Sequence, residues 1–100
     1  SHLPHVISYA LTQSLFSKLH ERTFEFSGGS LEDYTRIASS DPEMWKDIFI
    51  SNNKNILQSI DDFELSLKEL KELIKQQDDK AIEQFLHEIK TLRDSSLENE

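Results

Sequence analysis

Hydrophobic residues recur at helical spacing along most of the chain, whereas residues that favour turns are scarce. The spacing predicts about four helices, over residues 3–26, 31–38, 42–77 and 78–93. The chain of 100 residues contains only two glycines and two prolines. An all-β fold needs turn residues about every 8–12 positions, so this pattern excludes it. The sequence therefore predicts one all-α domain that covers residues 1–100.

The first predicted helix is apolar around much of its circumference, which indicates central burial or contact with two partners. Pro4 suits its first turn, because proline lacks only an N–H group that would be unpaired there. We expect this helix to end in a sharp reversal at Ser27-Gly28-Gly29-Ser30. Its broad apolar face is formed by Val6, Tyr9, Ala10, Phe16 and Leu19 and is widened by Ile7, Leu11 and Leu15.

The third predicted helix is unusually long. Asp41-Pro42-Glu43 is typical of a helix start, and no glycine or proline follows before Gln77. A helix of this length would extend roughly 55 Å, against a diameter of about 26 Å for a compact domain of this size. Its apolar residues form a heptad seam: Phe49, Ile56, Ile60, Phe63, Leu67, Leu70 and Ile74. We therefore expect either a break near Ser51-Asn52-Asn53 or a helix that packs on a second chain.

The last predicted helix begins at Asp78-Asp79, and we expect the acidic tail 94–100 to fray. Its apolar stripe is Ile82, Phe85, Leu86, Ile89 and Leu92.

The charge and composition exclude several classes of partner. Lys and Arg number 11 and Asp and Glu number 19, for a formal charge of −8. An acidic surface disfavours nucleic acid and anionic membranes, and no apolar run approaches the roughly 20 residues of a membrane span. We expect a cytoplasmic protein, without a leader peptide, which the absence of cysteine suits. Hydrophobic residues make up 36% of the chain, a thin supply for a compact monomer, which indicates either a dimer or a missing neighbouring domain.

Three polar clusters are candidates for function. His2 and His5 flank a helix start, where free N–H groups attract anions; the alternative is a tag remnant or ordinary surface histidines. Arg36 can bind a carboxylate or phosphate, or it pairs with Asp33 on the helix surface. Trp45 suits a core or interface anchor. No nucleophile–base motif, phosphate loop or glycine-rich dinucleotide motif is present, so we assign no catalytic, cofactor-binding or metal-binding residue.

Taken in order, these clusters resemble the C-terminal helical domain of prephenate dehydrogenases. The matching segments are Ser1-His2-Leu3-Pro4-His5, Gly28-Gly29, Asp33-Tyr34-Thr35-Arg36-Ile37-Ala38 and Ser40-Asp41-Pro42-Glu43-Met44-Trp45. The family oxidatively decarboxylates prephenate to 4-hydroxyphenylpyruvate in tyrosine biosynthesis, with NAD or NADP taking the hydride. The resemblance implies a preceding Rossmann domain that holds the cofactor and the catalytic histidine. It also implies an intertwined homodimer, and a fragment that is inactive alone.

The resemblance further implies roles for five residues. Arg36 matches the arginine that binds a substrate carboxylate, and His5 matches the histidine that hydrogen-bonds the substrate. Asp33 orients Arg36 or borders the pocket, and Ser1 lines it. Trp45 matches a tryptophan that reaches the substrate region from the partner subunit, whereas His2 is expected to be structural.

Two alternatives remain open at this point. The first is an arogenate dehydrogenase of the same family, whose substrate carries an amino group where prephenate has a ketone. The second is an acidic, non-enzymatic helical adaptor that binds a partner helix through the heptad seam and needs neither His5 nor Arg36.

Overall fold

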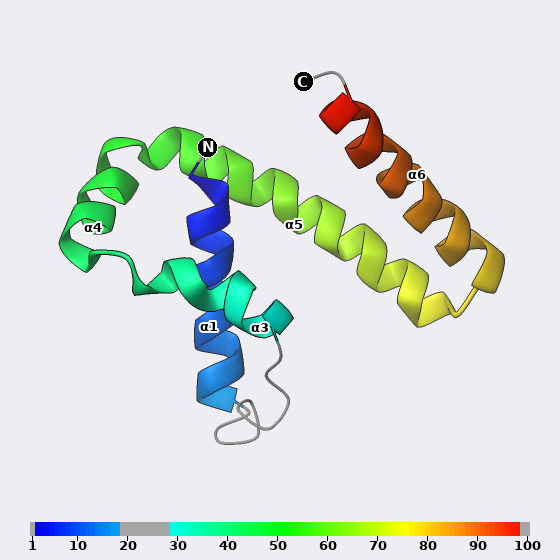
Figure 1. Ribbon diagram of the computed structural model, residues 1–100, viewed down its shortest axis with the longest axis horizontal. Coiled ribbons are helices and arrows are strands. Elements are labelled where there is room, and N and C mark those ends of the chain that lie inside the picture. Colours follow the sequence, from blue (N-terminus) through cyan, green and yellow to red (C-terminus); the bar gives the residue numbers. More distant parts are fainter. Residues whose placement is uncertain (1, 19–28, 99–100) are drawn as a thin grey trace. The chain divides into compact units, whose positions relative to one another are not determined.

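The fold is all-α, as the sequence predicts. The computed structural model describes residues 2–18 and 29–98, and these contain helices and no strand. The chain divides into two compact units, Ser1–Asp61 and Asp62–Glu100, each described by itself below. Figure 1 shows the order of the helices along the chain.

The first unit is built on α1 (Leu3–Lys18), which α3 (Gly29–Thr35) and a 3₁₀ turn, η1 (Arg36–Ser39), cross and contact (Figure 1). The predicted helix over 31–38 therefore starts earlier and tightens in its last turn, so Arg36 begins the 3₁₀ turn. The predicted end of the first helix near Phe26 lies outside the described residues, as do Ser27 and Gly28 of the expected reversal.

The predicted start at Asp41 is confirmed for α4 (Pro42–Ser51). The Asp41 carboxylate accepts a hydrogen bond of 3.1 Å from the backbone N–H of Glu43. Pro42 occupies the first turn, and the acidic Glu43 lies there too, where it suits the positive end of the helix dipole.

The expected break in the long helix is found at Asn52, between α4 and α5 (Asn53–Gln76). The backbone N–H of Asn52 donates to the Ile48 carbonyl at 3.0 Å, and its side-chain amide donates to the same oxygen at 3.5 Å. An asparagine side chain that competes for backbone groups favours such an interruption. The described residues consequently hold five α-helices where the sequence pattern indicated about four.

The second unit contains the end of α5 and helix α6 (Asp79–Glu98). Between these helices, Gln77 takes a positive φ of 56°. The Asp78 carboxylate caps α6 by accepting from the Ala81 N–H at 3.2 Å. The prediction that the chain frays after Arg93 is wrong, because α6 continues to Glu98. No glycine or proline stops the helix there, and Lys90 pairs with Asp94 at 2.9 Å.

The core of the first unit is small, and its most buried side chain is polar. Trp45 and Ile56 are each 8% exposed, whereas Ser8, in the middle of α1, is 1% exposed. The hydroxyl groups of Ser8, Tyr9 and Thr12 are all buried, and among residues 2–18 and 29–98 they have no hydrogen-bond partner. The predicted apolar face includes Tyr9 but neither Ser8 nor Thr12, because the pattern defines that face by hydrophobic residues alone.

Candidate functional site

The first turn of α1 and the first turn of α4 meet through two rings. His5 stacks on Trp45 with ring centroids 3.6 Å apart and an interplanar angle of 16°. Trp45 is the buried residue of α4, and His5 is half-buried. The Asp41 cap sets the start of α4, and Pro4 sets that of α1, so both rings project from ordered first turns.

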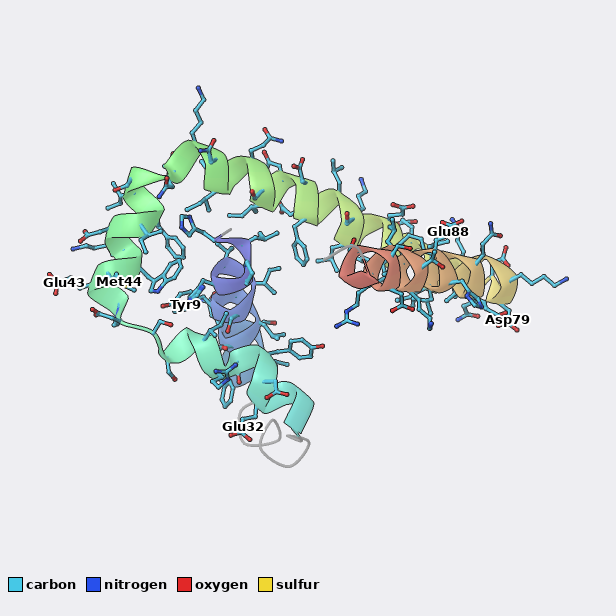
Figure 2. The ribbon with its side chains drawn as sticks, turned by 45° about the horizontal axis from the view of Figure 1, so that its top comes forward. Tyr9, Glu32, Glu43, Met44, Asp79 and Glu88 are labelled. Atoms are coloured by element: carbon cyan, nitrogen blue, oxygen red, sulfur yellow. The ribbon has the colours of Figure 1, made fainter. Side chains whose placement is uncertain are left out.

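Three more aromatic rings hold this pair in place. His2 meets Trp45 edge-on with centroids 5.6 Å apart, and Phe49 does so at 5.8 Å. Tyr9 packs edge-on against Phe49 at 6.0 Å. Figure 2 shows Tyr9 on the side of α1 that faces α4, whereas Glu43 points away. Edge-to-face packing of this kind fixes ring orientation as well as burying area.

Ser40, the residue after η1, connects this ring cluster to the segment that begins at Arg36. Its hydroxyl lies 3.3 Å from His5 Nε2 and donates to the Ile37 carbonyl at 2.6 Å. Its backbone N–H donates to the same carbonyl at 3.2 Å. Ser40 therefore fixes the end of η1 and also contacts the imidazole.

The two charged candidates are exposed and lie on segments that contact α1. Arg36 starts η1, which packs against α1, and Asp33 lies on α3. Within the described part of the chain, Asp33 and Arg36 form no ion pair with each other, and Arg36 makes no hydrogen bond to His5. Ser1 lies outside the described residues. The structure thus brings Trp45 to His5 within one chain and brings the segment of Arg36 to the same helix.

A shallow hollow of about 360 Å³ borders the ring cluster. Its lining is mostly apolar, with Lys46 as the charged member: Tyr9, Pro42, Trp45, Lys46, Phe49 and Ile50. The lining is thus aromatic and apolar with one basic side chain, and it includes neither His5 nor Arg36.

Neither a cluster of metal-ligating side chains nor a membrane-spanning helix is found in the described residues. They contain no group of three or more His, Cys, Asp or Glu placed to hold a metal ion. The sequence has only the adjacent glycines 28 and 29, which cannot form a glycine-rich dinucleotide motif. None of the helices in residues 2–18 and 29–98 combines the length and apolar character of a membrane span.

Sequence reasoning missed three residues that shape the site. Tyr9 and Phe49 follow His5 and Trp45 by four positions, and this i, i+4 spacing places each pair on one helix face. Ser40 belongs to a matched motif, but its contact with His5 depends on the packing of η1 against α1, which no local pattern reveals.

Comparison with known proteins identifies the family to which this chain is similar. The family model "Prephenate dehydrogenase, dimerization domain" matches residues 1–93. A cyclohexadienyl dehydrogenase of Zymomonas mobilis is 39% identical over 85% of this chain and 30% of its own length. Prephenate dehydrogenases of Bacillus subtilis and Lactococcus lactis are 30% and 34% identical, over 94% and 93% of this chain and 26% and 27% of theirs.

The chain thus spans less than a third of the length of these relatives. The family match, by contrast, covers nearly the whole chain, including every segment that carries a candidate residue. The chain therefore belongs to the family of prephenate dehydrogenase dimerization domains.

Proposed function

We propose that this chain is the C-terminal part of a prephenate dehydrogenase and supplies dimer contacts and substrate-binding residues. The whole protein would oxidatively decarboxylate prephenate to 4-hydroxyphenylpyruvate, with NAD or NADP accepting the hydride. The observation that carries the proposal is the stacked His5–Trp45 pair, joined through Ser40 to the segment of Arg36. Those residues belong to the motifs that resemble the family. The same proposal assigns the protein to the cytoplasm, which a sequence without cysteine suits.

In this proposal the residues of the chain recognise a dianion and perform no chemical step. The planar Arg36 guanidinium binds one carboxylate through two parallel hydrogen bonds. His5 hydrogen-bonds the pyruvyl side chain, and Trp45 forms an apolar wall. Asp33 and Ser1 border the pocket. Hydride transfer belongs to a cofactor-binding part outside this chain, because the chain has no dinucleotide motif of its own. The chain alone would therefore be inactive.

The proposed partner is a second copy of the protein. Along α5 and α6, apolar side chains are at least half exposed at Leu67, Ile74, Leu86 and Leu92. Exposed apolar residues at helical spacing favour burial against another helix, and the matching family is named for dimerization. We propose that these helices form a homodimer in which the two chains intertwine and Trp45 also borders the partner's pocket.

Arg36→Ala in the whole protein tests the proposed substrate site. We expect KM for prephenate to rise roughly 10- to 100-fold, because a bound carboxylate loses a charged hydrogen-bonding partner. Arg93→Ala is the matched control, since Arg93 is an exposed arginine of α6 that belongs to none of the motifs matched to the site. Steady-state kinetics measure both variants, and an unchanged KM in Arg36→Ala removes Arg36 from the site.

Arogenate is the competing substrate. Two of the relatives are named prephenate dehydrogenases and one is named a cyclohexadienyl dehydrogenase. Prephenate and arogenate differ at the ketone or amine near the proposed position of His5. A comparison of kcat/KM for the two compounds in the whole protein decides between them. We expect prephenate to be preferred, and a higher kcat/KM for arogenate would reassign the substrate.

A further inference from the structure

We propose that Ser40 is a positioning residue that holds His5 with its hydrogen on Nε2, so that Nδ1 is the nitrogen offered to the substrate. The inference rests on the proposed function for the identity of the substrate. It rests on the structure alone for the state of the imidazole ring.

The number of hydrogen bonds that the Ser40 hydroxyl can donate decides its role toward His5. A serine hydroxyl has one hydrogen to donate and can accept further hydrogen bonds. That hydrogen goes to the Ile37 carbonyl, whose oxygen lies 2.6 Å from Ser40 Oγ, a short and strong contact. The hydroxyl can therefore only accept from His5 Nε2, at 3.3 Å. A neutral imidazole that donates from Nε2 carries no hydrogen on Nδ1.

The stacking on Trp45 holds the plane of the imidazole ring. The two ring planes are within 16° of parallel and their centroids are 3.6 Å apart. Turning the imidazole out of this plane would break the stack and lose the contact with Ser40 together. Among the described residues Nδ1 has no hydrogen-bond partner, so the orientation leaves this nitrogen available.

The Ser40 contact also survives protonation of the ring. Nε2 carries a hydrogen in both the neutral and the charged imidazole. The pyruvyl side chain carries only acceptor oxygens, so the ring can hydrogen-bond it from Nδ1 only in the charged form, and Ser40 holds the same ring orientation in that form and in the neutral one. Ser40 therefore fixes the orientation of the His5 ring without fixing its charge.

The kinetic test uses Ser40→Ala and Ser40→Thr in the whole protein. Ser40→Ala should raise KM for prephenate roughly three- to tenfold, the effect of losing one positioning hydrogen bond, with a smaller change in kcat. Ser40→Thr keeps the hydroxyl and fits the extended backbone at this position (φ −69°, ψ 164°), so it should restore KM. In a His5→Asn background, Ser40→Ala should add nothing, because the group that it positions is already absent.

A purely structural role for Ser40 predicts a different pattern. If Ser40 served only to end η1 through Ile37, its removal would raise KM by the same factor with and without His5. That outcome overturns the proposal, as does a Ser40→Thr variant with the KM of Ser40→Ala.

Nitrogen NMR of the whole protein labelled with ¹⁵N-histidine tests the ring state without reference to turnover. The ring signals are assigned by their loss in His5→Asn. We expect neutral His5 to carry its hydrogen on Nε2, and Ser40→Ala to admit the Nδ1–H form. A hydrogen on Nδ1 in the unsubstituted protein overturns the proposal, even if Ser40→Ala fails to fold. Absence of prephenate turnover with the expected ring signals would refute only the proposed function.

Discussion

The two units of this chain satisfy their apolar residues in different ways. In the first unit, Trp45 is 8% exposed and contacts three other rings within the same chain. In the second unit, Leu67 and Ile74 continue the same heptad seam but are more than half exposed. The side chains of this heptad seam are thus buried near its start and exposed near its end.

This difference separates two tasks of the domain. The first unit is held by contacts between residues far apart in sequence, such as His5 with Ser40 and Trp45, which suits a site that needs fixed geometry. The second unit is a pair of long helices with little core of its own. Such a surface gains most from a partner that covers it.

Leu67→Glu should produce the largest effect, because it introduces a charge into the proposed dimer contact on α5. An unpaired charge costs about 3–5 kcal/mol and is buried twice in a symmetric interface, so the dimer dissociation constant should rise at least about 10⁴-fold. Sedimentation velocity of the whole protein measures this change.

Leu65→Glu is the matched control for that experiment. Leu65 is also a leucine of α5 and is 68% exposed, but its position falls on the opposite side of the helix from Phe63 and Leu67. The control should remain dimeric. A dimer that persists in Leu67→Glu would contradict the assignment of the stripe to a second copy.

Trp45→Ala should lower the free energy of unfolding by about 3–5 kcal/mol, since it empties the centre of the ring cluster. Chemical denaturation followed by circular dichroism measures the change. Tyr34→Ala, at an aromatic residue that is 68% exposed, should change it by less than about 0.5 kcal/mol. Equal effects at the two positions would mean that the ring cluster is not a core.

Ser8→Ala should make the smallest change, and should stabilise the protein. The Ser8 hydroxyl is buried without a partner, so its removal relieves a desolvation cost. Ser14→Ala, on the exposed side of α1, measures the gain from helix propensity alone, about 0.5 kcal/mol. We expect Ser8→Ala to exceed it by about 1 kcal/mol in denaturant titration. Equal gains would show that the Ser8 hydroxyl is satisfied in solution.

The sequence predicted the helices and several of their ends, because those depend on local chemistry. Asp41 caps α4 and Asp78 caps α6 as residues of their type do, and the break was expected near Asn52. The length of α6 was misjudged, because an acidic sequence without glycine or proline can continue a helix as readily as fray.

The interior of the site depends on packing and was harder to predict. Ser8 is buried only because of how α1 is turned in the first unit, and the partner of His5 depends on where η1 crosses α1. The roles of His5 and Arg36 came from a family resemblance, since spacing alone favoured a surface ion pair for Arg36. The structure shows no such pair between Asp33 and Arg36 among the described residues.

The most direct test of the account is a crystal structure of the whole protein with prephenate bound. The account predicts that the Arg36 guanidinium contacts a substrate carboxylate and that His5 Nδ1 hydrogen-bonds the same molecule, with Trp45 beside its ring. Prephenate bound away from both residues would contradict the account. His5 and Arg36 on opposite sides of the domain would contradict it too.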